Sequence, residues 1–248
     1  MSFTVIIPAR YASSRLPGKP LCDIAGKAMI QRVFEAASAS KADRVFVATD
    51  DDRVHDAVLS FGGASIMTSK RHSSGTDRLQ EAAELLQLEA SDIVVNVQGD
   101  EPLIPAAVIN QVAENLAGND WASLATLAEP IDSEEELHNP NVVKVLADEH
   151  GRALYFSRAP IPYVRDRSET QLPVSNRHVG LYAYRVSFLN QFIRWPEHSM
   201  ERAEKLEQLR ALANGAAIHL AQSVCDIPVG VDTEEDLLAI RQLLAGRS

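Results

Sequence analysis

The chain has 248 residues, of which 46% are apolar and 23% are charged, and its formal net charge is −10. This length accommodates one large α/β domain or two small ones. The acidic balance argues against general affinity for nucleic acid or anionic membranes, so an anionic substrate would need a local positive pocket. Cys22 and Cys225 form no metal or redox motif, and no apolar run suits a signal peptide or a bilayer span. A reduced, cytoplasmic setting is therefore expected.

A basic loop follows the first apolar run of the chain. Residues 5–7 predict a buried strand that ends at Pro8, because proline has no N–H to donate to a sheet. The loop after it carries Arg10, Arg15 and Lys19 and matches neither glycine-rich phosphate motif. Guanidinium groups bind phosphate oxygens in pairs, and lysine adds a point charge. The loop is therefore a candidate triphosphate site, although a solvated basic loop would have the same composition.

Strand and helix patterns then alternate through the first half of the chain. Buried strands are predicted at residues 44–50, 65–67 and 93–97, and helices at 29–37, 51–59, 76–88 and 105–116. This alternation predicts a mostly parallel, right-handed wound sheet, in which ligands bind at the carboxyl ends of the strands. The polar strand ends at Arg10, Asp50 and Asp100 are therefore where we expect a site.

The second half of the chain has a different pattern. Two apolar runs flank a turn at residues 148–151 and predict a hairpin. Further strands are expected at residues 178–184 and 218–220, and helices at 206–213 and 233–244. With no repeat or obvious linker, we expect one domain over residues 1–248. Its predicted fold is an α/β three-layer sandwich with a mixed, mainly parallel sheet and a small antiparallel insert at about 140–185.

Two aspartates are candidate metal ligands. Asp100 follows a buried strand and a glycine, a position that suits a hard divalent cation, but turn formation or helix capping is the better explanation on the residues alone. Asp232 reads as the start of a helix, with Glu235 completing a capping box. On the residues alone, the capping interpretation is favoured for both.

The triplet Asp50-Asp51-Asp52 satisfies the D-x-D pattern of many metal-dependent glycosyltransferases. Acidic residues are also favoured in the first turn of a helix, because the helix dipole is positive there. We assign the triplet no catalytic role.

Several motifs together resemble one enzyme family. Ile7-Pro8-Ala9-Arg10 and Arg15-Leu16-Pro17-Gly18-Lys19-Pro20-Leu21 resemble the signature of sugar nucleotidyltransferases that activate acidic sugars with CTP, and most of all the 3-deoxy-manno-octulosonate (Kdo) cytidylyltransferases. The resemblance continues over nearly the whole chain, at residues 74–78, 98–102, 155–158, 178–182, 206–210 and 230–236. It implies a fold of the nucleotide-diphospho-sugar transferase type.

The resemblance also implies a reaction and its residues. CTP and Kdo would give CMP-Kdo and pyrophosphate, for lipopolysaccharide biosynthesis, in a homodimer that uses Mg²⁺. The nucleotide-binding residues would be Ala9, Arg10, Arg15, Lys19, Ser74, Gly75, Arg78 and Asp100, with residues 74–78 reading the cytosine ring. Asp100 and Asp232 would hold the metal and, with Arg10 and Lys19, form the catalytic set. The sugar-binding residues would be Gln98, Arg158, His178, Tyr182 and Glu207.

Without the resemblance, the sugar-binding residues have ordinary structural interpretations. A lone histidine such as His178 is more often structural, Arg158 reads as a surface residue, and Glu207 reads as part of a solvated helix face. Three other functions stay open. They are a cytidylyltransferase for 8-amino-Kdo or a sialic acid, a glycosyltransferase that uses Asp50 and Asp52, and a non-catalytic nucleotide-sugar binding module. Pyrophosphate release from CTP with Kdo separates the expected function from the last two.

Overall fold

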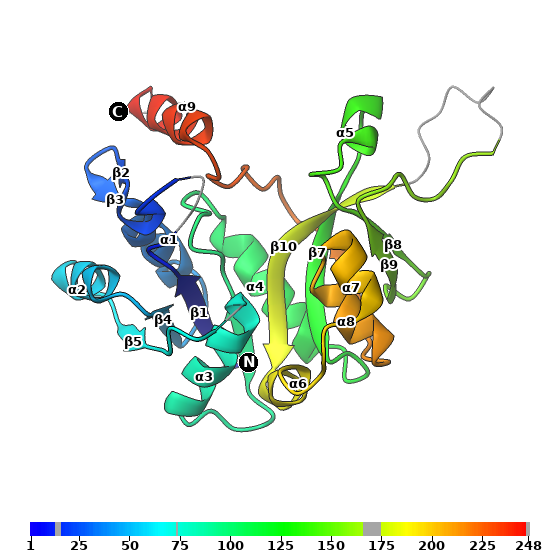
Figure 1. The fold of residues 1–248 in the computed structure, drawn as a ribbon, viewed down its shortest axis with the longest axis horizontal. Coiled ribbons are helices and arrows are strands. Elements are labelled where there is room, and N and C mark those ends of the chain that lie inside the picture. Colours follow the sequence, from blue (N-terminus) through cyan, green and yellow to red (C-terminus); the bar gives the residue numbers. More distant parts are fainter. Residues whose placement is uncertain (13–15, 73, 166–174, 247–248) are drawn as a thin grey trace.

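A nine-stranded sheet runs through the computed structural model, which describes residues 1–12, 16–72, 74–165 and 175–246. Its strands are β1 (Thr4–Ala9), β4 (Arg44–Thr49), β5 (Ser65–Met67), β6 (Ile93–Asn96), β7 (Leu124–Pro130), β8 (Lys144–Ala147), β9 (Ala153–Ser157), β10 (Asn176–Arg185) and β11 (Ile218–Gln222). The order is β11-β7-β10-β6-β1-β4-β5, with β8 and β9 attached beside β10 (Figure 1). Neighbours run parallel except where β10 pairs with β6, β7 and β8, and within the β8–β9 hairpin. The predicted mixed, mainly parallel sheet is confirmed.

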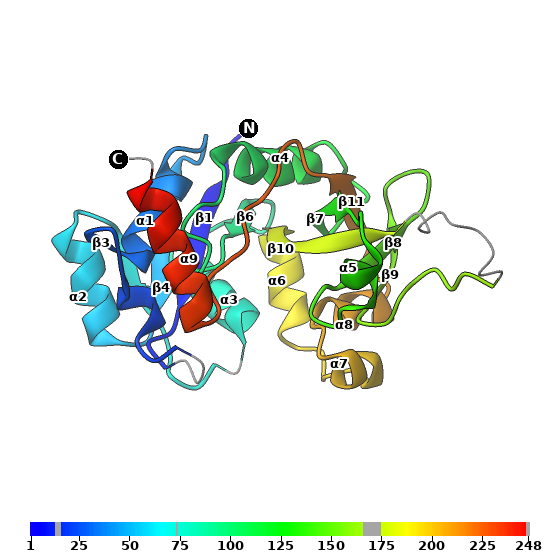
Figure 2. The ribbon, with the colours of Figure 1, turned by 90° about the horizontal axis from the view of Figure 1, so that it is seen from above.

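Helices cover both faces of this sheet. One core cluster joins it to α1 (Met29–Ser38), α2 (Asp52–Ser60) and α4 (Ala106–Ala117), and the other joins it to α3 (Gly75–Leu85), α6 (Val186–Phe192) and α8 (Gln208–Ala213). Figure 2 shows α4 on one side of β7 and β10, with α6 and α8 on the other. The predicted three-layer sandwich is therefore confirmed. Among the described residues, no helix combines the length and apolar character needed to cross a membrane.

Six further elements complete the described part of the chain. They are η1 (Lys19–Leu21), β2 (Asp23–Ile24), β3 (Lys27–Ala28), α5 (Glu134–His138), α7 (Ser199–Glu204) and α9 (Glu234–Ala245). Helix α9 lies on the opposite side of the molecule from the helices that precede it in the sequence, and it packs against β2 (Figure 1). A small third core holds it there, formed by Leu16, Ile24, Met29, Val231, Leu237 and Ile240. This contact brings the C-terminal segment to the loop that follows β1.

The first strand is longer than predicted. We expected it to stop at Pro8, but β1 continues to Ala9. The backbone N–H of Val97 donates to the Ile6 carbonyl, so the backbone polar groups of Ile6 point toward β6. Those of Pro8 point the same way, because every second residue of a strand faces the same neighbouring strand. Pairing with β6 ends at Ile6, while pairing with β4 continues to Ala9. Proline is tolerated because no ladder partner requires its missing N–H.

Strand β7 was not predicted. Its sequence, Leu-Ala-Thr-Leu-Ala-Glu-Pro, contains a single β-branched residue, so it lacks the composition that marks a buried strand. Strand β10 lies antiparallel between β6 and β7, and the hairpin β8–β9 was predicted correctly. The single domain with an insert over about 140–185 stays a prediction; β8 and β9 lie off the main strand order, and β10 lies within it.

Candidate active site

A polar pocket of about 340 Å³ lies at the carboxyl ends of β1 and β6. This is the edge at which an open α/β sheet binds its ligands. The pocket is lined by Pro8, Ala9, Arg10, Ala12, Lys19, Pro20, Gln98, Gly99, Asp100 and Asp232. Of the predicted phosphate-binding residues, Ala9, Arg10 and Lys19 thus lie together, and Arg15 lies outside the described residues.

Lys19 lies between the two predicted metal ligands. Its Nζ is 2.6 Å from Asp100 Oδ2 and 3.0 Å from Asp232 Oδ1. The ammonium group is mostly buried, whereas the two carboxylates are partly exposed to the pocket. Two acidic side chains that are distant in sequence therefore converge on one positive centre.

The backbone brings Asp232 to Asp100. The N–H of Val231 donates to the Asp100 carbonyl at 2.8 Å, which fastens the segment before α9 to the loop after β6. Gly230 allows this approach, because a Cβ there would lie 3.2 Å from the Asp100 carbonyl oxygen. Gly99 is equally constrained, since its Cβ would be 2.9 Å from the Pro8 carbonyl oxygen of β1.

Neither aspartate caps a helix. The N-cap of α9 is Thr233, which forms a capping box with Asp236, so the predicted box from Asp232 to Glu235 is wrong by one residue. The N-cap of α4 is Pro105, several residues after Asp100. Both carboxylates are therefore available to the pocket instead of serving as helix caps.

The pair of carboxylates fits a Mg²⁺ ion. The Lys19 ammonium stands in for a cation that both oxygens face. Within the part of the chain that the structure describes, no cluster of three His, Cys, Asp or Glu side chains forms a closed metal cage. Mg²⁺ is commonly held by one or two carboxylates, with substrate phosphates and waters completing its shell. Asp100 and Asp232 match this open type of site.

Glu101 is a residue that sequence reasoning missed. Burial, together with the neighbouring charge of Asp100, raises the pKa of its carboxyl to about 8. Its Oε2 is buried and has no hydrogen-bond partner among the described residues. A glutamate after a polar strand end ordinarily faces solvent, so the only signal was its place in the motif at residues 98–102.

The segment between β5 and α3 closes one side of the site. Arg10 donates to the His72 carbonyl at 2.8 Å, and Glu81 of α3 accepts from Ser69 N at 2.7 Å. Ser74 is the N-cap of α3 and forms a capping box with Asp77, so its capping interpretation holds. Contact of Ser74 and Gly75 with a cytosine ring stays a prediction.

Arg78 is completely buried. Its guanidinium donates to Asp50 Oδ2 at 2.7 Å and to Thr68 Oγ1. Arg78 does not line the polar pocket. Direct contact with a base would require this network to open, so a nucleotide-binding role for Arg78 stays a prediction.

The Asp50-Asp51-Asp52 triplet has structural roles. Asp50 pairs with Arg78, and Asp51 is the N-cap of α2, accepting from Arg53 N at 3.0 Å. Asp52 is the first residue of α2. This arrangement agrees with the helix-start interpretation and provides no support for a D-x-D metal site.

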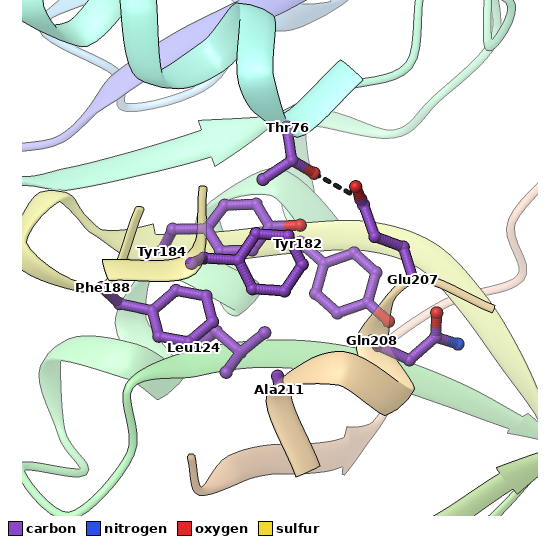
Figure 3. A pocket seen from close by; sticks show the side chains of 9 residues that line it. Thr76, Leu124, Tyr182, Tyr184, Phe188, Glu207, Gln208 and Ala211 are labelled. Atoms are coloured by element: carbon purple, nitrogen blue, oxygen red, sulfur yellow. Dashed lines mark hydrogen bonds between the residues drawn. The ribbon is translucent and has the colours of Figure 1, made fainter. Parts of the chain in front are cut away.

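A second, aromatic pocket of about 40 Å³ lies between β10, α3 and α8 (Figure 3). Its lining residues are Thr76, Leu124, Tyr182, Tyr184, Phe188, Phe192, Glu207, Gln208 and Ala211. Tyr182 Oη and Glu207 Oε1 are buried, and neither has a hydrogen-bond partner among the described residues. Burial also raises the pKa of Glu207. Unpaired buried polar atoms are costly, so they indicate where a polar ligand binds.

Three of the other predicted sugar residues have defined partners. His178 packs edge-on against Phe156, and burial lowers its pKa to about 3, which keeps the imidazole neutral at pH 7. Gln98 lines the polar pocket and donates to the Gly180 carbonyl of β10 at 3.4 Å, which links this pocket to the strand that carries Tyr182. Arg158 lines neither pocket and instead donates to the carbonyls of Glu204 and Pro140.

Comparison with known proteins gives consistent matches. The model of a family described as Cytidylyltransferase matches residues 4–218. Two relatives named 3-deoxy-manno-octulosonate cytidylyltransferase are similar along their whole length. The protein from Cellvibrio japonicus is 59% identical, and that from Saccharophagus degradans is 58% identical. The aligned region covers 98% of this chain in both cases, and 98% and 99% of the respective relatives.

Solved structures agree with these matches. A CMP:2-keto-3-deoxy-manno-octonic acid synthetase complexed with CTP superposes with a TM-score of 0.92 at 44% identity, covering 100% of this chain and 99% of that one. A 4-diphosphocytidyl-2C-methyl-D-erythritol synthase has a TM-score of 0.65 at 15% identity, covering 98% and 100%. The second likeness concerns the fold alone.

Proposed function

The chain belongs to the 3-deoxy-manno-octulosonate cytidylyltransferase family, and on this premise we propose that it transfers CMP from CTP to Kdo. The anomeric hydroxyl of the sugar loses its proton to solvent as its oxygen forms a bond to the α-phosphorus of CTP. The bond from the α-phosphorus to the oxygen that bridges to the β-phosphate breaks, and pyrophosphate leaves with that electron pair. The observation that carries this proposal is the convergence of Asp100, Asp232 and Lys19 on one centre at the strand ends.

The polar pocket supplies the charge that this reaction requires. Arg10 and Lys19 bind phosphate oxygens, and Arg15 lies in the same basic loop. Asp100 and Asp232 would hold Mg²⁺, which would supply neutralisation of the phosphate charge. Lys19 would donate to the triphosphate. Phosphoryl transfer depends mainly on positioning and charge neutralisation, and these residues supply both.

The sugar would occupy the cavity of about 460 Å³ that adjoins the aromatic pocket, because Glu207 lines both and the aromatic pocket itself has room for only a few waters. Tyr182 Oη and Glu207 Oε1 are the unpartnered polar atoms that sugar hydroxyls would satisfy. His178 is neutral and adjoins Tyr182, with ring centroids 5.3 Å apart, so it contributes hydrogen bonding without charge. Gln98 lines the polar pocket and donates to the strand that carries Tyr182, where the two substrates would meet.

The reaction can be tested directly with the purified protein. Kdo, 8-amino-Kdo and a sialic acid are each incubated with CTP, UTP, ATP and GTP, and pyrophosphate release is measured. We expect release with CTP and Kdo. Release confined to 8-amino-Kdo or a sialic acid would change the substrate, and no release with any pair would refute the proposed transfer.

Removal of the Lys19 charge should weaken CTP binding. In Lys19→Met we expect the KM for CTP to rise by about tenfold or more, because a charged hydrogen bond to phosphate contributes about 1.5–3 kcal/mol. Lys27→Met is a matched control, since Lys27 pairs with Glu35 on the surface at 2.6 Å. Steady-state kinetics of both variants check this, and a wild-type KM for CTP in Lys19→Met would contradict the phosphate assignment.

A homodimer is also proposed. The β9 strand pairs with β8, and its outer face presents Leu154, which is 56% exposed. Tyr163, in the segment after β9, is also exposed. An apolar edge strand of this kind needs cover, and a two-fold partner that presents the same surface would provide it.

Light scattering checks the dimer. We expect the mass of two chains for the wild type at micromolar concentration, and a shift toward one chain in Leu154→Glu, because a buried charge opposes association. Leu85→Glu is the matched control, since Leu85 is equally exposed at 56% but lies on α3. A monomeric wild type, or equal behaviour of the two variants, would argue against this interface.

A further inference from the structure

A hydrogen bond joins the first turn of α3 to the residue that precedes α8 (Figure 3). Thr76 Oγ1 donates to Glu207 Oε2 at 2.5 Å, and Thr76 is only 4% exposed. Helix α3 packs beneath β1 and β4, whereas α8 packs against the side of the molecule formed by β9 and β10. The bond therefore connects the part of the protein that holds the nucleotide to the part that holds the sugar.

Thr76 fixes how the Glu207 carboxylate is turned. Its bond occupies Oε2, which leaves Oε1 buried in the lining of the aromatic pocket without a partner among the described residues. The nearby cation Arg210 is 3.8 Å from Oε1, but its guanidinium is bound to Glu201 at 2.5 and 2.8 Å. The Thr76 hydroxyl thus holds Oε2 and, together with the Ser74 hydroxyl, orients the Glu207 carboxylate.

Thr76 also lies beside the predicted nucleotide contacts. Ser74, two residues earlier, caps α3 and lines a cavity of about 460 Å³ together with Glu207. A short helical turn is stiff, so a displacement of Ser74 and Gly75 moves Thr76 with it. A shift at the nucleotide site therefore reaches Glu207 through the Thr76 hydroxyl and, beside it, the Ser74 hydroxyl.

We infer that Thr76 is a positioning residue that orients Glu207 toward the sugar and makes sugar binding depend on nucleotide binding. This inference rests on the proposed function. Thr76 itself touches neither reacting atom in this scheme; it acts through Glu207.

Kinetics of the isosteric variant provide the first test. Thr76→Val keeps the shape of the side chain and removes the hydroxyl. We expect the KM for Kdo to rise by about tenfold, since the lost bond is to a charged group, while the KM for CTP changes much less. Thr76→Ser should restore the KM for Kdo. Thr4→Val is the matched control, because Thr4 is equally buried at 4% and lies at the opposite end of β1.

Calorimetry tests the coupling between the sites. Kdo is titrated into the protein with and without CMP, which carries the base and one phosphate but cannot transfer it. We expect CMP to tighten Kdo binding in the wild type and in Thr76→Ser, and to tighten it less in Thr76→Val, which keeps only the Ser74 hydroxyl. Equal effects of CMP in all three proteins, or none in the wild type, would overturn the coupling.

The pH profile provides a readout that general loss of stability would not move. Burial raises the pKa of Glu207, and the hydroxyls of Thr76 and Ser74 offset part of that increase by favouring the ionised form. Loss of the Thr76 hydroxyl therefore raises this pKa further. The other groups facing Glu207 are unchanged by the substitution; they are Arg210, Asp77, Glu197, Glu201, Lys205, Tyr182 and Tyr184.

The acidic limb of the plot of 1/KM for Kdo against pH should thus move to higher pH in Thr76→Val and stay in place in Thr76→Ser. An unmoved limb together with a wild-type KM for Kdo would refute the role of Thr76 and leave the proposed reaction intact. Failure of the wild type to form CMP-Kdo would instead refute the proposed reaction.

Discussion

Asp100→Asn and Asp232→Asn should each lower kcat for CMP-Kdo formation by about a hundredfold or more, because a bound metal contributes several kcal/mol of charge stabilisation in the transition state. Asparagine keeps the size of aspartate and replaces a charged oxygen ligand with a neutral one. Neither side chain caps a helix, since Thr233 and Pro105 occupy those positions. The lost pairing with Lys19 involves carboxylates that are 34% and 50% exposed, so the melting temperature should change little.

Two measurements separate the metal site from a structural role. Binding of Mn²⁺, followed by electron paramagnetic resonance in the presence of CTP, should weaken in both variants, and kcat should fall in parallel. Asp120→Asn is the control, because the Asp120 side chain is fully exposed and lies beside a different cavity. Near-normal turnover and wild-type Mn²⁺ affinity in both Asp100→Asn and Asp232→Asn would remove the metal site from the mechanism.

Local sequence patterns were sufficient for most of the fold. The β-branched runs of β1, β4 and β6 identify buried strands because both faces of these strands are covered, and the intervening helices follow from their apolar spacing. Strand β7 was not predicted because its leucines and alanines suit a helix equally well. The end of β1 was predicted too early, at Pro8. Proline interrupts a strand only where a neighbouring strand needs the N–H that proline lacks, and this depends on how the strands pair in the assembled sheet.

The site was predictable only in part, for a similar reason. The strand-end rule alone indicated Arg10, Asp50 and Asp100, of which Arg10 and Asp100 line the polar pocket and Asp50 pairs with Arg78 instead. The approach of Asp232 depends on the hydrogen bond from Val231 to Asp100 and on the packing of α9 against β2, both of which are long-range contacts. No local pattern contains them, so only the resemblance to the cytidylyltransferases placed Asp232 in the site.

Arg78 shows what a sequence motif does not state about a side chain. The motif at residues 74–78 implied a guanidinium that reads cytosine, whereas the structure places that group between Asp50 and Thr68 with no exposed surface. A side chain can belong to a binding motif because it supports the backbone that makes the contact. Whether it does so depends on its burial and partners, which the motif does not state.

Arg78→Ala should therefore lower the free energy of unfolding by about 3–5 kcal/mol, because it leaves the Asp50 carboxylate poorly solvated and without its cation. Asp50 is 19% exposed, which places the expected cost toward the lower end of this range. Chemical denaturation followed by circular dichroism measures the change. Arg44→Ala is the control, since Arg44 is an exposed arginine at the start of β4.

A double-mutant cycle then assigns the loss to the Arg78–Asp50 pair. Asp50→Ala alone should also be strongly destabilising, because it leaves a buried guanidinium with one partner fewer, and the double variant should cost clearly less than the sum of the two single changes. The base-reading role makes the opposite forecast: Arg78→Ala would fold with wild-type stability and lose its discrimination between CTP and UTP. Wild-type stability with relaxed base choice would therefore place Arg78 in the nucleotide site, whereas a large, non-additive loss of stability would make it a support of the loop at residues 68–74.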